Sequence, residues 1–253
     1  MLAPASQEPR RLTRNRFHLG EVLRLSFWVW IKNLVPFMAL SVLLHGPLLA
    51  WAGYLLALGS DAPLEAWSRF GTATSLAGVL VNSLLSAAVT FGVVMELDRR
   101  PQPIGRVIAL GLRRFLPAIA VVILTSLAIF GATLLLVVPG IIVACMLYVA
   151  VPASVIEQPG IRGALGRSRA LTAGNRLKVL VLLILGQVVN LGVLVPIAVA
   201  VVGDARPHLL PVADLIRSIV AGPLLAVVVA TTYSLLRRQR DGAAPDELAR
   251  VFE

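Results

Sequence analysis

Five long stretches of the chain contain no Asp, Glu, Lys or Arg, and they constrain the fold more than any other feature. They cover residues 33–60, 70–95, 115–156, 179–203 and 218–236. A helix needs about 20 apolar residues to cross the roughly 30 Å hydrocarbon core of a bilayer. Four of the stretches fit one span each, whereas the stretch at 115–156 is long enough for two.

The longest stretch carries a turn signal at its midpoint. Val138-Pro139-Gly140 combines a residue that cannot continue a helix with one that tolerates a positive φ. We therefore predict a turn at these residues and six transmembrane helices in total. Spans of this length suit helices and not barrel strands of about 10 residues, because spanning backbone must satisfy its own hydrogen bonds. The predicted spans are 34–58, 72–96, 117–137, 141–157, 178–202 and 215–236.

The composition agrees with a membrane protein and excludes a disordered chain. Hydrophobic residues make up 58% of the sequence and charged residues 14%, against about 45–50% and 25% in soluble domains. The predicted fold class is an all-α integral membrane protein. We expect residues 1–16 to form a flexible basic tail, residues 17–236 the six-span membrane domain, and residues 237–253 a short cytoplasmic tail.

The basic residues are distributed unevenly between the two sides of such a bundle. If successive loops lie on opposite sides, one side carries 20 Lys and Arg residues and the other only Arg69, Arg206 and Arg217. Positive residues favour the cytoplasmic side of a membrane. This asymmetry predicts an even number of spans with both termini in the cytoplasm.

Three basic segments each precede a pair of spans and share a weak repeat. Residues 20–25 and 105–110 both read Gly-x-Val-[Leu/Ile]-x-Leu, and the segment from Gly163 matches only loosely. Segment 104–116 is amphipathic at helical spacing. We predict three amphipathic helices on the cytoplasmic surface, with arginines toward lipid phosphates. The alternative is that these segments are extensions of the spans.

The same surface can bind anionic lipid headgroups, with each basic residue contributing on the order of 1 kcal/mol. Of the 23 basic residues 21 are Arg, which can bind phosphate with two hydrogen bonds. Nucleic acid is not an expected partner, because the charge is spread over four short membrane-adjacent segments. A role in topology alone is the alternative explanation of this charge. The candidate lipid contacts are Arg24, Lys32, Arg106, Arg113, Arg114, Arg176 and Lys178.

A carboxylate, Glu157, ends the fourth predicted span at the cytoplasmic interface. Isolated charges at membrane depth are expensive, so we predict an ion pair with a guanidinium of the following segment. The candidate partners are Arg162, Arg167 and Arg169. Solvation of the carboxylate at the interface is the alternative. Further along, Gly174 suits the C′ position of one helix and Asn175 the N-cap of the next.

Polar side chains within the predicted spans form a third set of candidates. They are His45 in the first span, Asn82 in the second, and Gln187 and Asn190 in the fifth. Such residues either hold helices together through hydrogen bonds or line a polar pathway at mid-membrane. Both interpretations are compatible with the sequence.

No catalytic or metal-binding pattern is present in the sequence. The three histidines have no metal-type spacing, and the single cysteine, Cys145, allows neither an intramolecular disulfide nor a Cys-based zinc site. A nucleophile elbow, a phosphate-binding loop and a dinucleotide fingerprint are all missing. We expect a protein that is not an enzyme and that has no cofactor or metal.

The segment 139–176 resembles a bacterial integral membrane family of unknown biochemical role, similar to the membrane domain of some glycerophosphoryl diester phosphodiesterases. The resemblance is carried by Pro139-Gly140, Val151-Pro152, Ala164-Leu165-Gly166-Arg167-Ser168 and Leu171-Thr172-Ala173-Gly174-Asn175-Arg176. It implies a protein of a bacterial inner membrane, with a six-helix membrane region that stands alone or carries a catalytic domain. Because a hydrolase barrel needs about 250 residues, we expect the tail at 237–253 to lack the catalytic domain and its activity.

Taken together, these features predict a non-enzymatic multispan membrane protein. Its expected role is that of a lipid-interacting scaffold or of a membrane subunit in a larger assembly, with lipids as partners and with a homo-oligomer or another membrane protein as a further expected partner. The alternative is a transporter for a small solute or a lipid that uses the polar residues at mid-membrane.

Overall fold

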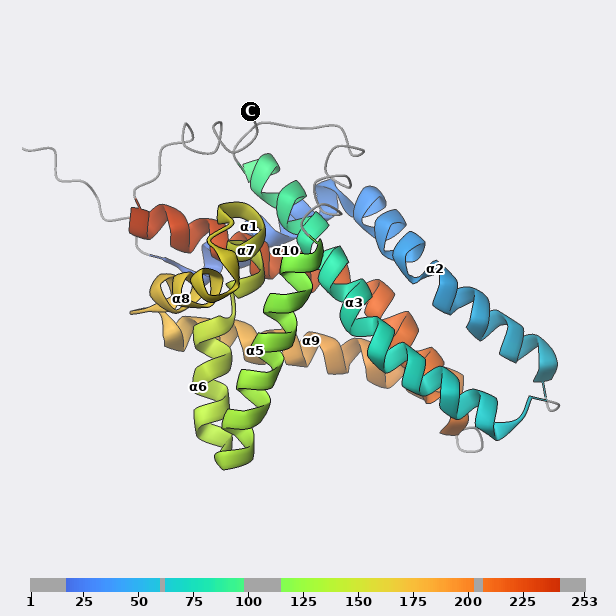
Figure 1. Cartoon of the computed structure of the whole chain (residues 1–253). Helices are drawn as coiled ribbons and strands as arrows, with labels where there is room; N and C mark the ends of the chain where they lie inside the picture. Colours follow the sequence, from blue (N-terminus) through green and yellow to red (C-terminus); the bar gives the residue numbers. More distant parts are fainter. Residues whose placement is uncertain (1–16, 60–61, 98–114, 203–206, 242–253) are drawn as a thin grey trace, which may run out of the picture.

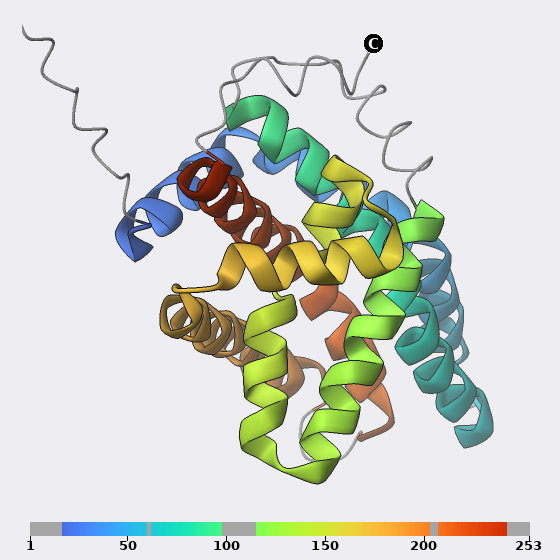
Figure 2. The same cartoon turned by 60° about the vertical axis from the view of Figure 1, so that its left-hand side comes forward.

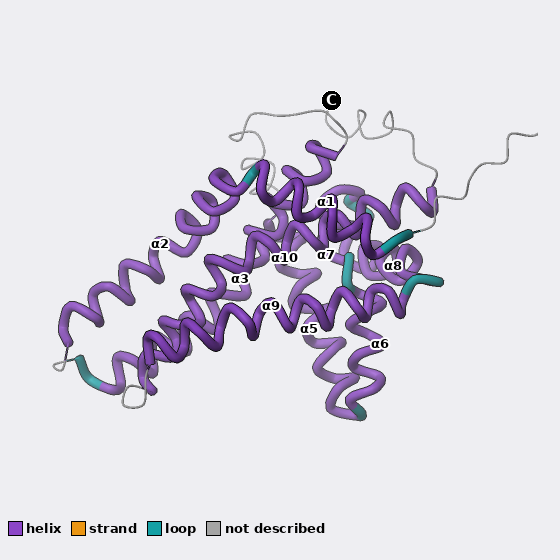
Figure 3. The backbone as a smooth tube through the Cα atoms, turned by 180° about the vertical axis from the view of Figure 1, so that it is seen from behind, coloured by secondary structure: helices purple, strands orange, loops and turns teal. Residues whose placement is uncertain are grey.

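All regular elements in the described part of the chain, residues 17–59, 62–97, 115–202 and 207–241, are helices in this computed structural model (Figure 3). These helices form six segments that are long and apolar enough to cross a membrane. Five of the segments are single helices, and α6 and α7 together form the sixth. The prediction of an all-α chain with six such helices is confirmed. The elements are α1 (Leu19–Lys32), α2 (Leu34–Leu58), α3 (Leu64–Leu97), α5 (Phe115–Leu135), α6 (Val137–Leu147), α7 (Ala150–Glu157), α8 (Gly160–Thr172), α9 (Arg176–Val202), the short 3₁₀ helix Pro207–Leu209, and α10 (Leu210–Asp241).

The helices α3 and α10 extend beyond the predicted spans. α3 begins at Leu64 and not at 72, and α10 covers Leu210–Asp241 and not 215–236. Charged residues are accommodated within these extensions, as in the exposed pair of Arg69 with Glu65 one turn earlier, at 2.7 Å. The absence of charge therefore marks the apolar part of a span, while the helix itself continues into the polar region.

The turn between α5 and α6 lies at Leu136, so the predicted turn at Val138-Pro139-Gly140 is wrong by a few residues. Leu136 has extended backbone, with φ −162° and ψ 145°. Pro139 occupies the first turn of α6, where its missing N–H costs no helical hydrogen bond. Gly140 lies against α5, because an added Cβ would come within 2.0 Å of Thr133 Oγ1. The glycine is needed for close helix packing and not for a turn.

A break in the fourth span separates α6 from α7 at Tyr148 and Val149. Pro152 accounts for it, since its ring would clash with the carbonyl of Tyr148 in a continuous helix. The carbonyl of Met146 lies just before the break and faces α8. Ser168 and Thr172 of α8 donate to this carbonyl through their hydroxyls, at 2.9 and 3.3 Å. The interrupted span is thereby tied to α8, which crosses its end (Figure 2).

The core of the bundle forms around α10, which packs against α1, α2, α3 and α9. Figure 1 shows α2, α3 and α10 running along one another, while the α5–α6 hairpin projects in another direction. The most apolar windows of α3 and α10 are 56% and 61% buried, against 11% for α5 and 6% for α9. Large exposed apolar surfaces of this kind mark contact with a partner or a membrane. The lightly buried α5 and α9 would therefore face lipid in a bilayer.

Two of the three predicted surface segments lie in the described residues, as the helices α1 and α8. α1 packs on α10 and buries Val22, Ser26 and Val29. Gly174 at the end of α8 has a φ of 83°, as predicted for a C′ position. The remaining predicted segment, 104–116, lies outside the described residues up to residue 114, and this part includes Arg106, Arg113 and Arg114. The tails 1–16 and 242–253 also lie outside the described residues.

A proline in the middle of α10 creates a polar contact between two spans. Pro223 has no N–H, so the carbonyl of Ile219 loses its helical donor. The hydroxyl of Ser41 in α2 donates to this carbonyl at 3.0 Å, and both residues are buried. The hydrogen bond thus satisfies a backbone group for which the hydrocarbon core offers no other partner.

We predict that Ser41→Ala lowers the free energy of unfolding by about 0.6 kcal/mol and by at most about 1.7 kcal/mol, the range measured for interhelical hydrogen bonds in membrane proteins. In a Pro223→Ala background, the restored N–H serves Ile219 and the loss should shrink. Ser75→Ala is the control, since exposed Ser75 bonds only its own helix. Denaturation in mixed micelles measures all four variants. An equal loss in both backgrounds would contradict the assignment.

Candidate lipid-binding site

The predicted ion pair of Glu157 is formed with Arg167. Arg167 Nε lies 2.6 Å from Glu157 Oε2, and the hydroxyl of Tyr233 donates to Glu157 Oε1 at 2.8 Å. Arg167 also pairs with Asp241 at the end of α10. Arg237 Nε lies 3.9 Å from Glu157 Oε1 and 4.0 Å from Asp241 Oδ2. Two carboxylates and two guanidiniums therefore connect the ends of α7, α8 and α10.

This cluster of charges is shielded from solvent, with side chains that are only 14–28% exposed. Burial alone would lower the pKa of Arg167, but the hydrogen bonds that its guanidinium donates to Asp241 and Glu157 raise that pKa above the ordinary value. Arg167 is thus charged at any physiological pH. The two other candidate partners, Arg162 and Arg169, are exposed and form no ion pair within the described residues.

The sequence did not indicate Tyr233, Arg237 or Asp241 as members of this cluster. Tyr233 lies inside an apolar run and is fully buried, and nothing in its neighbourhood marks it as the partner of a carboxylate. Asp241 lies in the segment that was expected to be a tail, beyond 236, whereas it belongs to α10. Only the three-dimensional approach of α7 to α10 reveals these residues.

We predict that Glu157→Gln lowers the free energy of unfolding by about 3 kcal/mol, because it leaves Arg167 and Arg237 beside a neutral amide in a shielded site. Tyr233→Phe should cost about 1 kcal/mol, the value of one hydrogen bond. Glu65→Gln is the matched control. It removes the pair with Arg69, whose side chains are more than 70% exposed, and we expect little change.

Thermal unfolding in detergent compares these variants. Exchange of the two charges, with Arg at 157 and Glu at 167, should recover part of the expression that either reversal alone abolishes. If the exchange restores nothing and Glu157→Gln behaves like the exposed control, the pair does not stabilise the protein.

The four polar residues predicted at mid-membrane do not form one site. His45 is buried in α2, where its Nδ1 meets the carbonyl of Ser41 at 2.8 Å and its Nε2 has no partner among the described residues. Asn82 bonds the carbonyl of Gly78 in its own helix at 2.9 Å. Gln187 and Asn190 contact each other at 3.4 Å on α9. Each of these contacts lies within the residue's own helix.

Arg217 joins the α9 pair and was not expected there. Its guanidinium donates to Asn190 Oδ1 at 2.6 Å and to Asp214 Oδ1 at 2.8 Å. The sequence count placed Arg217 on the outer side of the membrane, and the structure places it in the N-terminal third of α10, before the charge-free stretch. The i,i+3 spacing of Asp214 and Arg217 beside an apolar run was an available signal for a paired charge.

A basic pocket of about 700 Å³ lies where α1, α3 and α10 meet. Lys32 at the end of α1 pairs with Glu96 near the end of α3, and its Nζ lies 5.0 Å from the centroid of the Trp28 ring. Arg238 of α10 donates to the carbonyl of Leu97 at 2.9 Å. The residues that line the basic pocket are Arg24, Leu25, Trp28, Lys32, Glu96, Leu97 and Arg238.

Among the described residues that line the basic pocket, three are cations and one is a carboxylate. Arg24 is exposed and forms no hydrogen bond or ion pair within the part of the chain that the structure describes. Two of the predicted lipid contacts, Arg24 and Lys32, are thus brought together. Arg176 and Lys178 lie apart from them at the start of α9, where Lys178 donates to the carbonyl of Phe17.

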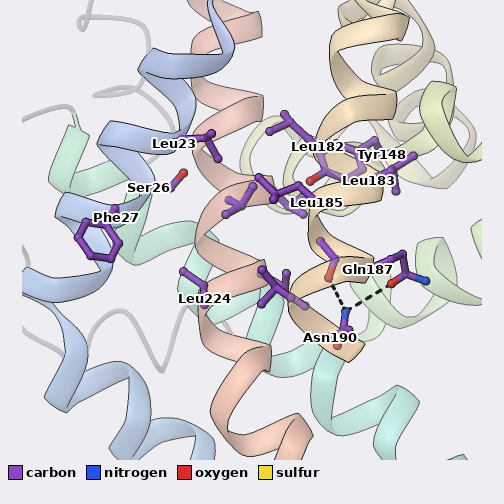
Figure 4. A pocket seen from close by; sticks show the side chains of 15 residues that line it. Leu23, Ser26, Phe27, Tyr148, Leu182, Leu183, Leu185, Gln187, Asn190 and Leu224 are labelled. Atoms are coloured by element: carbon purple, nitrogen blue, oxygen red, sulfur yellow. Dashed lines mark hydrogen bonds between the residues drawn. The ribbon is translucent and has the colours of Figure 1, made fainter. Parts of the chain in front are cut away.

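An apolar pocket lies on another face of α1, between α1, α9 and α10 (Figure 4). Residues 23–27 of α1, 182–190 of α9 and 224–229 of α10 contribute to its lining, together with Tyr148. Gln187 and Asn190 are its principal polar groups on α9, whereas His45 and Asn82 do not line it. A continuous polar path from Asn82 to Gln187, which transport by these residues would need, is not formed by this pocket.

No protein family, curated protein or solved structure matches this chain. The functional argument therefore depends on the two pockets and on the charges that surround them.

Proposed function

We propose that this chain is a non-enzymatic, multispan membrane protein that binds anionic phospholipid at the basic pocket, as a scaffold or as the membrane subunit of a larger assembly. The observation that carries the proposal is the exposed guanidinium of Arg24 in the basic pocket, which has no hydrogen bond or ion pair among the described residues. A phosphate group matches such a guanidinium, since Arg can donate two parallel hydrogen bonds to it.

The placement of the basic pocket at a membrane surface is supported by the composition of α1. Its exposed side carries Phe27, Trp28 and Ile31 beside Arg24 and Lys32. Aromatic and apolar side chains that alternate with cations are typical of helices in the plane of the headgroups. We therefore propose that α1 lies in the interface, with the basic pocket at headgroup level.

The cytoplasmic side is the side we assign to this pocket. The contacts of Lys32 with Glu96 and of Arg238 with Leu97 bring together the ends of α1, α3 and α10. These ends lie at three of the four segments for which the count of Lys and Arg predicts a common side. Cytoplasmic leaflets carry anionic lipid, and we propose a bacterial inner membrane with both termini inside. The likeness of residues 139–176 to the membrane family named above is part of the same proposal.

We expect Arg24→Gln to weaken binding of phosphatidylglycerol roughly fivefold, the effect of removing one interfacial cation, with little change for phosphatidylcholine. Native mass spectrometry of the detergent-solubilised protein, titrated with each lipid, gives both affinities. Arg162→Gln is matched in charge and exposure but lies on α8, outside the basic pocket. Equal weakening by both variants, or by neither, would show that the basic pocket is not a specific headgroup site.

A further inference from the structure

The apolar pocket between α1, α9 and α10 opens to the surface of the bundle. Among its lining residues, Leu23 is 39% exposed, Phe27 57% and Leu185 37%. The neighbouring face of α9 is apolar and exposed as well, at Ile184 and Val188 among others. In a membrane, such an opening faces lipid and not water, so its occupant is apolar.

The size of the apolar pocket limits the kind of occupant. Its volume is about 420 Å³, and residues 182–190 extend about 12 Å along α9. A single extended hydrocarbon chain fits in the pocket. The length of chain that the pocket would hold, about 12 Å along α9, approaches the roughly 15 Å depth of the hydrocarbon in one leaflet.

A polar group inside the apolar pocket has no partner. Ser26 is only 2% exposed, and its Oγ accepts and donates no hydrogen bond within the described residues. Figure 4 shows Leu23 and Ser26 on the side of α1 that faces α10. A buried hydroxyl without a hydrogen bond destabilises a protein, and alanine would pack equally well at this position. The hydroxyl lies beneath the lining of the pocket, and a rotation of the Ser26 side chain would present it to an acceptor carried by the occupant.

The opposite end of the apolar pocket is closed by groups that are already bonded. Asn190 Nδ2 donates to the carbonyl of Gly186 at 3.1 Å and to Gln187 Oε1, while its own Oδ1 accepts from Arg217. The polar end on α9 is thus engaged by protein, and the unpartnered hydroxyl lies on α1. An occupant would place its polar group at α1 and its apolar part along α9 and α10.

We infer that the apolar pocket binds one hydrocarbon chain of an acylglycerol lipid, whose ester carbonyl accepts a hydrogen bond from Ser26. If α1 lies at the membrane surface, as in the proposed function, Ser26 is at the depth of the glycerol esters and the chain descends along α9. The chain site is distinct from the headgroup site, because α1 presents Ser26 to one pocket and Arg24 to the other.

Gly186 offers a matched pair of variants for the test. An added Cβ at Gly186 would lie 3.6 Å from Leu225 Cδ2, which is an ordinary contact, so Gly186→Ala should leave the chain site open. Gly186→Phe should fill it. The probe is a phosphatidylcholine with a photoreactive diazirine in its acyl chain, reconstituted with the full-length protein, and peptide mass spectrometry locates the label.

We expect at least fivefold more label in residues 182–190 than in residues 127–134 of the equally lipid-facing α5, for the original protein and for Gly186→Ala. Gly186→Phe should abolish this enrichment, and Ser26→Ala should reduce it several-fold. If Gly186→Phe does not fold, as judged by its circular dichroism, Leu225→Trp fills the pocket from α10 and replaces it.

Label spread evenly over α5 and α9, or enrichment that survives filling of the pocket, would overturn the inference. The Arg24→Gln variant distinguishes a failure of this inference from a failure of the proposed function. Loss of the preference for phosphatidylglycerol with unchanged chain labelling supports two independent sites, whereas loss of chain labelling in that variant would contradict a separate chain site.

Discussion

The shielded charges around Glu157 are the interaction on which the arrangement of this bundle depends. One carboxylate accepts from Arg167 of α8 and from Tyr233 of α10, at 2.6 and 2.8 Å, while it ends α7. Because α10 is also the helix against which α1, α2, α3 and α9 pack, a contact that fixes its end positions the rest. Charges so far from water need partners on every side, and this requirement makes the contact specific.

A second constraint comes from backbone groups that the apolar surroundings leave unsatisfied. Pro223 frees the carbonyl of Ile219, and Ser41 of α2 donates to it. At the break before Pro152, Ser168 and Thr172 of α8 donate to the carbonyl of Met146. Proline within a span therefore acts here as a source of interhelical contacts. This explains why small hydroxyl residues are buried between helices that are otherwise apolar.

The number and type of the helices follow from the charge-free stretches, because length and apolarity are local properties that the sequence states directly. The pairing of Glu157 was also accessible, since a carboxylate at a span end needs a cation nearby. The position of the α5–α6 turn at Leu136 was not, because the same Pro-Gly pair serves a turn or a tight helix contact. The partners Tyr233 and Asp241, the Arg217–Asn190 contact and both pockets depend on how helices distant in sequence approach each other.

The central claim is that six helices cross the membrane and leave the ends of α1, α3 and α10 on the cytoplasmic side. Accessibility of single cysteines to an impermeant maleimide tests it most directly, in a Cys145→Ala background that removes the one native thiol. In intact bacterial cells, Ser60→Cys and Ala205→Cys should react, and Ser6→Cys and Ala243→Cys should react only after permeabilisation. Labelling of the two termini from opposite sides would contradict the claim.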